Sequence, residues 1–253
     1  MIHLGAGAEP GRDVRIPGMT LASEQWSFLE GEYLSSSISA ALGRSGTYKD
    51  EEELTPGADG RPDKNGPTVV GKAFRAKIVE LAKSYEGASI TGEEHIRNIK
   101  ELAKYVSDAC PQYLRKDCPR FGVAAKALTL YLKYLWCAGK AQEPPHCPFD
   151  RIVIAALHKL QSLPRDLRDL SWTQMDEGTY RQLVSEAERR LKDESLARWE
   201  LKEWQNSQMI EVLHRMVLDR GLKSNRSPAH WRSEVNSSSP QSWQSPARRQ
   251  CTP

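Results

Sequence analysis

Apolar residues recur three and four positions apart along most of the chain, which is the spacing of one face of an α-helix. Capping residues, glycines and prolines divide this pattern into segments. Seven helices are predicted, at about residues 23–43, 70–85, 91–106, 123–137, 150–160, 173–191 and 195–217. No segment shows a convincing strand pattern. The sequence therefore predicts an all-α fold with a single globular helical domain spanning residues 21–222.

The segment 123–137 differs from the others because it is apolar on nearly every side. Its sequence, VAAKALTLYLKYLWC, is interrupted only by Lys126, Thr129 and Lys133. A helix without a polar face has to be surrounded by the rest of the protein. We expect it to be the most buried helix. Core positions are expected among Leu130, Leu132 and Leu135.

Three segments lack a helical pattern. Residues 1–20 contain Gly and Pro with little periodicity, and residues 49–67 are acidic and rich in Gly and Pro. Residues 223–253 are rich in Ser, Pro and Arg. Such a composition buries too little apolar surface to offset the entropy of ordering. The expectation is a flexible N-terminal arm, a mobile insertion and a disordered basic tail that is dispensable for folding.

The formal net charge of +3 is concentrated at the C-terminal end. From Arg220 onward the sequence has six Lys or Arg residues against the single acidic residue Glu234, so the preceding part is slightly negative. A nucleic-acid partner would therefore have to recognise a local basic cluster.

The cysteines and the hydropathy limit the class of protein. The five cysteines are an odd number without Cys-x-x-Cys pairs, which favours reduced thiols and no metal or cofactor. A metal site around Cys137, His146 and Cys147 is the less favoured alternative. Neither a signal sequence nor an apolar run of membrane-spanning length is present, so we expect a cytoplasmic protein without a membrane partner.

The segment 121–150 contains the most informative motifs. Gly122-Val123-Ala124-Ala125-Lys126 opens the apolar helix after a hairpin-like turn near residues 115–125, and Pro148-Phe149-Asp150 follows a Pro-rich crossing. Residues 121–160 resemble the helix-hairpin-helix DNA glycosylases, both the endonuclease III-like and the 8-oxoguanine glycosylase-like members. In that superfamily a G-V-G-x-K turn leads into a helix, and a P-V-D segment supplies an aspartate. Here Ala124 replaces the second glycine, and the Lys-to-Asp separation of 24 is nearer the archaeal 8-oxoguanine type.

The resemblance implies that Lys126 and Asp150 are the catalytic residues. Lys126 would attack the sugar C1′ and form a Schiff base, and the first turn of an apolar helix favours the uncharged amine that this step needs. Asp150 would stabilise positive charge on the sugar or help to move the lysine proton. The structural alternative is that Asp150 caps the next helix while Lys126 extends to solvent.

Residues near the hairpin-like turn are the candidate contacts to DNA. A phosphate could be held by exposed amides at Gly122 together with Lys126 and nearby basic side chains. These side chains are Arg115, Lys116 and Arg120. The alternative is a solvated loop whose charges are partly offset by Asp117. His146 could contact a flipped base, or be a structural loop histidine.

The function expected from these residues is that of a DNA base-excision glycosylase, with or without lyase activity, which cleaves the N-glycosidic bond of a damaged base. The alternative is a non-enzymatic helical module that binds nucleic acid or protein. The slightly negative body of the chain favours the alternative, and the arrangement of Lys126 and Asp150 favours the enzyme.

Overall fold

A computed structural model describes residues 23–43, 45–54, 61, 63–115, 121–192 and 194–206. The predicted arm 1–20, the predicted tail 223–253 and the end of the last predicted helix lie outside these residues. So do Lys116 and Arg120, two of the candidate DNA contacts.

The described chain is helical, which confirms the predicted all-α class. The longer helices are α1 (Ser23–Leu42), α2 (Gly66–Ala82), α3 (Gly92–Ala109), α4 (Phe121–Cys137), α5 (Arg151–Leu160) and α7 (Glu177–Leu191), followed by a helix at residues 196–206. Shorter elements are η1 (Glu51–Glu53), η2 (Lys83–Tyr85), α6 (Arg165–Arg168) and η3 (Trp172–Gln174). The β structure among the described residues is one isolated bridge between Tyr48 and Leu114.

Side-chain caps begin three of these helices, and the starts of α3 and α5 agree with the predicted ones. Thr91 and Glu94 form a capping box at α3, and the carboxylates of Asp150 and Asp176 accept backbone amides at α5 and α7. The predicted helix 173–191 is divided, because η3 ends at Gln174 before Asp176 caps α7. Helix α2 begins at Gly66, four residues before the predicted start.

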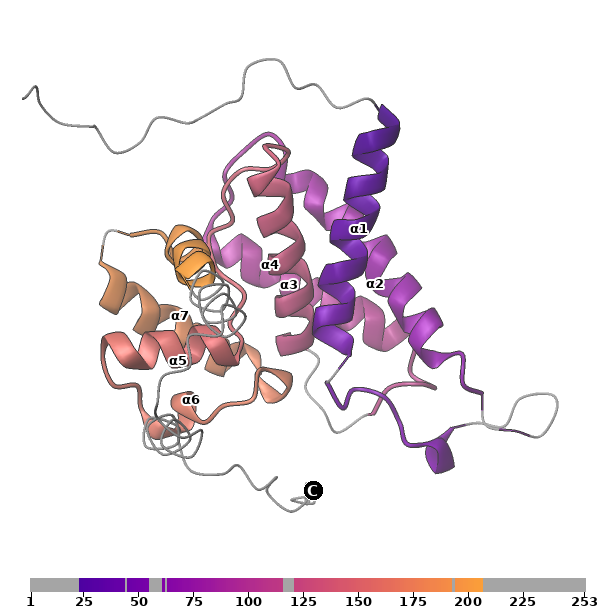
Figure 1. Cartoon of the computed structure of the whole chain (residues 1–253). Coiled ribbons are helices and arrows are strands. Elements are labelled where there is room, and N and C mark those ends of the chain that lie inside the picture. Colours follow the sequence, from indigo (N-terminus) through magenta and orange to yellow (C-terminus); the bar gives the residue numbers. More distant parts are fainter. Residues whose placement is uncertain are drawn as a thin grey trace, which may run out of the picture.

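Helix α4 is central, and the prediction that it is the most buried helix is confirmed (Figure 1). Twelve of its seventeen residues are buried, including Leu132 and Leu135. Leu130 is only half-buried, because it shares a face with Lys126 and Lys133, where the helix meets polar partners. A sequence that is apolar on nearly every side of the helix therefore identified the central helix. It did not show which way its one polar face points.

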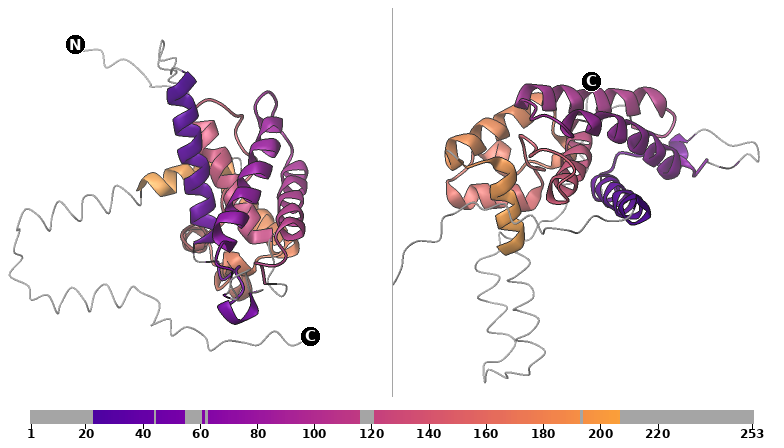
Figure 2. Two further views of the ribbon diagram at one scale, coloured as in Figure 1. Left: turned by 90° about the vertical axis from the view of Figure 1, so that its right-hand side faces the viewer. Right: turned by 90° about the horizontal axis from the view of Figure 1, so that it is seen from above.

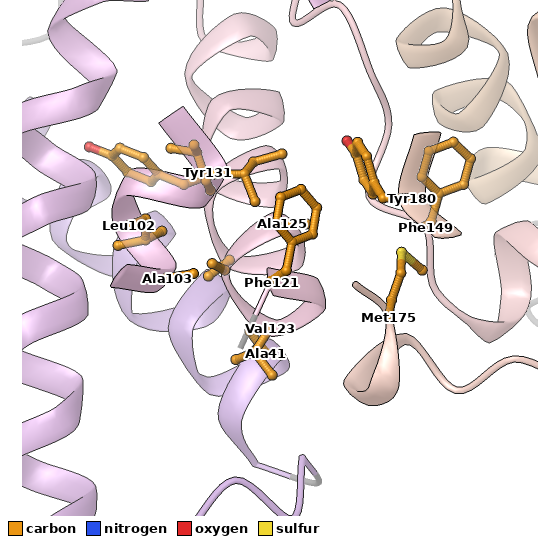
Figure 3. Packing of buried hydrophobic residues seen from close by; sticks show 14 of the residues in the cluster. Ala41, Leu102, Ala103, Phe121, Val123, Ala125, Tyr131, Phe149, Met175 and Tyr180 are labelled. Atoms are coloured by element: carbon orange, nitrogen blue, oxygen red, sulfur yellow. The ribbon is translucent and has the colours of Figure 1, made fainter. Parts of the chain in front are cut away.

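Helix α4 joins two groups of helices. It packs against α1 and α3 on one side, and against η3 and α7 on the other (Figures 1 and 2). The Phe121 ring lies 5.3 Å from that of Tyr180, which also contacts Phe149 (Figure 3). Met175 lies in the same buried group, so the start of α4 is enclosed by both halves of the chain.

The described parts of segment 49–67 are attached to the residues before α4. The Lys49 amide donates to the Tyr113 carbonyl oxygen at 3.0 Å, and the Tyr113 hydroxyl donates to Asp63 Oδ2 at 2.5 Å. Gly66 packs against the Tyr113 ring and already belongs to α2. Both described ends of this segment are therefore held by one tyrosine.

Candidate functional site

Lys126 and Asp150 meet where α4 passes the start of α5. The Lys126 Nζ atom lies 3.7 Å from Asp150 Oδ2. The side chains are 14% and 28% exposed, so the pair lies at the edge of the interior. The structure thus brings together the two residues that the sequence proposed as catalytic.

The Lys126 ammonium also lies over the ring of Trp172. The Nζ atom lies 4.3 Å from the centroid of the Trp172 ring, which η3 carries. A carboxylate and an aromatic face both stabilise a cationic amine. A reaction that needs the neutral amine would therefore have to move a proton from Lys126 first.

The Asp150 carboxylate has two tasks in the structure. Its Oδ1 atom accepts the amides of Ile152 and Val153 at 2.9 and 3.2 Å, as the structural alternative expected of a helix cap. Its Oδ2 atom is the one that approaches Lys126. Capping α5 therefore also fixes the orientation of the carboxylate toward the lysine.

Gly122 lies inside the first turn of α4 and not in an exposed turn. Its amide donates to the Met175 carbonyl oxygen at 3.0 Å. A Cβ atom at Gly122 would lie only 1.9 Å from the Trp172 carbonyl oxygen, and residues 121–125 are all buried. The amide expected to hold a phosphate is instead used to bind η3 to α4, and only glycine permits this approach.

Arg115, the other described member of the predicted phosphate cluster, also contacts its own chain. Its Nη1 atom lies 3.9 Å from Asp50 Oδ2, and its amide donates to the Thr47 carbonyl oxygen at 3.1 Å. The contacts of Arg115 thus agree with the alternative of a loop whose charge is partly offset by an acidic side chain, whereas Gly122 belongs to a buried helix turn.

His146 is buried among other polar side chains. Its Nδ1 atom lies 3.2 Å from the Tyr180 hydroxyl, and a Cβ atom at Gly92 would lie 2.8 Å from Nε2. Burial lowers the pKa of His146 to about 4. The ring lies in the interior, away from a surface where it would meet a flipped base.

A second buried histidine, His95, was not singled out from the sequence. It is hydrogen-bonded to the Tyr85 hydroxyl at 2.7 Å and to Thr129 Oγ1 at 3.1 Å, and its ring meets His146 edge to face. Burial is the main reason that its pKa lies well below the usual value. Its position four residues before Ile99, on the apolar stripe of α3, was a readable signal of burial.

A second Lys–carboxylate pair on α4 was also missed. Lys133 Nζ lies 2.8 and 2.6 Å from the two Glu200 carboxylate oxygens, and both side chains are buried. Burial raises the pKa of Glu200 against the opposing effect of Lys133. The seven-residue spacing from Lys126 placed Lys133 on the same helix face, but nothing local to Lys133 indicated its partner.

Other classes of site lack support among the described residues. No three His, Cys, Asp or Glu side chains in that part of the chain come close enough to hold a metal ion. None of its helices combines the length and apolarity needed to cross a membrane. Two surface hollows lie along α1 and between α1 and α2, and neither is lined by Lys126 or Asp150.

Comparisons with protein families, curated proteins and solved structures found no match to this chain.

Proposed function

We propose that this protein is a DNA base-excision glycosylase in which Lys126 and Asp150 are the reactive pair. The observation that supports the proposal most directly is the 3.7 Å approach of their charged groups, from two helices and across 24 residues of sequence. The resemblance of residues 121–160 to the helix-hairpin-helix glycosylases assigns chemistry to the same two positions.

In this proposal Asp150 accepts a proton from the Lys126 ammonium and releases the amine as a nucleophile. The nitrogen lone pair then forms a bond to the sugar C1′ while the bond from C1′ to the base breaks. The departing base takes the bonding electrons and is protonated from Asp150. Asp150, now ionised again, takes a second proton from the nitrogen and passes it to the ring oxygen as the C1′–O4′ bond breaks, and the nitrogen lone pair forms the C=N bond of the protonated Schiff base.

Trp172 imposes a condition on this chemistry. Its ring lies 4.3 Å from the Lys126 ammonium, which is only 14% exposed at the side chain, so in this proposal the ring moves aside when a nucleotide reaches the amine. The ring can move in two ways. Either the Trp172 side chain turns alone, or η3 moves as a whole and the hydrogen bond between Gly122 and Met175 breaks. Lesion-containing DNA should therefore change the fluorescence of Trp172. This change should be absent in Trp172→Phe, which identifies Trp172 as its source.

A second candidate function is the non-enzymatic binding module. Two observations favour it: the Lys126 ammonium already has a carboxylate and an aromatic partner, and the first turn of α4 is buried. Under this alternative the pair stabilises the junction of α4, α5 and η3, and binding takes place elsewhere on the surface.

Duplexes that carry single oxidised, deaminated or alkylated bases separate the two functions when sodium borohydride is present. The wild-type protein should release one of these bases and form a covalent adduct. Asp150→Asn keeps a capping side chain, so it should fold, bind DNA and release no base. Lys126→Gln should lose the adduct, whereas replacing the exposed lysine of α5, Lys159→Gln, should keep it.

The negative outcomes are equally informative. DNA binding without base release from any duplex would support the binding module over the enzyme. An adduct that persists in Lys126→Gln would exclude Lys126 as the nucleophile. Absence of DNA binding would overturn both the glycosylase and a nucleic-acid-binding module.

A further inference from the structure

A polar hollow lies between α1 and α2, away from Lys126 and Asp150. It has a volume of about 320 Å³, at the lower end of the range for small-ligand sites. The two helices that form it lie side by side (Figure 1). Its lining comprises Ser35, Ile38 and Ser39 from α1 and Pro67, Thr68, Gly71, Lys72 and Arg75 from α2.

The charge of this hollow is positive. Lys72 and Arg75 line it, and no carboxylate does. Neither cation forms an ion pair with any residue of the described ranges. Lys77 on the same helix shows the contrast, because it contacts both Glu80 and Glu101.

Arg75 is held in place without losing its capacity to bind an anion. Its Nη2 atom donates to Ser35 Oγ at 2.7 Å, and Ser35 Oγ donates in turn to the Gly31 carbonyl oxygen at 2.8 Å. A guanidinium has five N–H donors in a plane, so most of them stay available after this contact. The serine orients the group, and no ion pair with a carboxylate of the described residues occupies it.

Hydroxyl groups and the start of α2 add further donors. Ser39 and Thr68 have hydroxyls without a hydrogen-bond partner within the described residues. Asn65 forms no side-chain cap at the start of α2, and the first turn of that helix has no acidic residue. The positive end of the helix dipole therefore adds to the field of Lys72 and Arg75.

Gly71 leaves the space inside the hollow open. A Cβ atom added there would meet no atom within 4 Å, whereas one added at Gly122 would meet a carbonyl oxygen. The absence of a side chain at Gly71 is thus not required by packing within the described chain. It keeps room beside Lys72 and Arg75.

We propose that this hollow binds a phosphate group, with Arg75 and Lys72 as charged contacts and the hydroxyls of Ser39 and Thr68 as further donors. A tetrahedral anion with several acceptor oxygens matches a fixed guanidinium, an ammonium and two hydroxyls. Ile38 and Pro67 form an apolar edge for the molecule that carries the phosphate. This inference does not depend on the reaction proposed for Lys126 and Asp150.

Calorimetric titration of the full chain with inorganic phosphate tests the site, with chloride at equal ionic strength as the control anion. Wild-type protein should bind phosphate at one saturable site. Arg75→Gln should weaken binding about tenfold, the loss expected for a charge-assisted hydrogen bond. Lys83→Gln removes an exposed charge of η2, outside the hollow, and should leave binding unchanged.

Gly71→Leu blocks the hollow by a different means. Leucine favours a helix more than glycine does, and the added Cβ atom has no clash, so the variant should fold at least as stably as the wild type. It should nevertheless lose phosphate binding. If phosphate binds no better than chloride, or binds Gly71→Leu and Arg75→Gln as tightly as the wild type, the proposal is overturned.

A second titration identifies the source of the phosphate. If Arg75→Gln and Gly71→Leu weaken the binding of a short unmodified DNA duplex as well, the site holds a nucleic-acid phosphodiester. If they affect inorganic phosphate alone, its ligand is a small phosphorylated molecule. The glycosylase proposal is tested by base release and the borohydride adduct, and this one by phosphate titration, so failure of one is distinguishable from failure of the other.

Discussion

Two lysines on one face of α4 have opposite environments although each meets a carboxylate. Lys126 lies 3.7 Å from Asp150 at the edge of the interior, and Lys133 lies 2.6 Å from Glu200 with both side chains below 10% exposure. Asp150 also accepts two backbone amides, whereas the hydrogen bonds of Glu200 go to Lys133. The first carboxylate keeps partners without its lysine, and the second does not.

The two ion pairs differ in what it costs to break them. A buried ion pair contributes little net stability but is costly to break, because one charge stays in a dry environment. A pair near water exchanges its partners at small cost. Lys126 can therefore leave its carboxylate at a smaller cost, as the proposed function requires, and Lys133 joins the helix at residues 196–206 to α4.

Loss of the Lys133 ammonium should have the largest effect on stability. Lys133→Met leaves Glu200 buried without its partner, and the free energy of unfolding should fall by about 3–5 kcal/mol in urea titrations. The loss should be smaller at pH 5 than at pH 8, because burial already raises the pKa of Glu200 and an unpaired carboxyl is more readily protonated. A loss below about 1 kcal/mol would contradict the dry environment assigned to this pair.

The pH dependence of stability tests another dry polar group, His146. Its folded pKa of about 4 lies below the unfolded value near 6.5, so the unfolded chain binds more protons between these values. The contribution of His146 to the free energy of unfolding is therefore fully present above pH 6.5. It is lost as the pH is lowered toward 4, and the loss is roughly 3 kcal/mol. Unfolding titrations at several pH values measure the loss. An NMR titration of the ring with a midpoint near 6.5 would be incompatible with its burial.

Gly122 permits the close approach of η3, the element that carries Trp172. Gly122→Ala places a methyl group on the Trp172 carbonyl oxygen and should lower the free energy of unfolding by about 1–3 kcal/mol. Gly71→Ala is the matched control, because it lies in open space on another helix and should raise stability by about 0.5–1 kcal/mol. Equal melting temperatures for the two variants would show that η3 can shift away from the added methyl group without a loss of stability.

Loss of the Lys126 charge should have the smallest effect. Lys126→Met should cost at most about 1 kcal/mol, because Asp150 keeps its two amide partners and stays near water. Asp150→Ala removes the cap of α5 and should lower the free energy of unfolding by about 1 kcal/mol. Asp150→Asn keeps a capping side chain and should lower it by less. A cost for Lys126→Met equal to that of Lys133→Met would remove the distinction between the two pairs.

Signals within one or two helical turns made much of the fold predictable. Apolar spacing identified the longer helices, capping residues placed the starts of α3 and α5, and the apolar character of α4 on nearly every side identified the central helix. Lys126 and Asp150 were paired through a family resemblance, and not through any local rule. The short α6 and the early start of α2 were missed, because few apolar residues mark them.

The sequence by itself thus determined the helical class and the centre of the protein, because helix periodicity and capping depend on residues within about four positions. The tertiary structure alone decided that Lys126 lies over the Trp172 ring, that the Gly122 amide binds Met175, and that Glu200 meets Lys133. These contacts join residues about 45 to 70 positions apart. They depend on how loops and helix packing place distant segments, and the side chains carry no local signal of that placement.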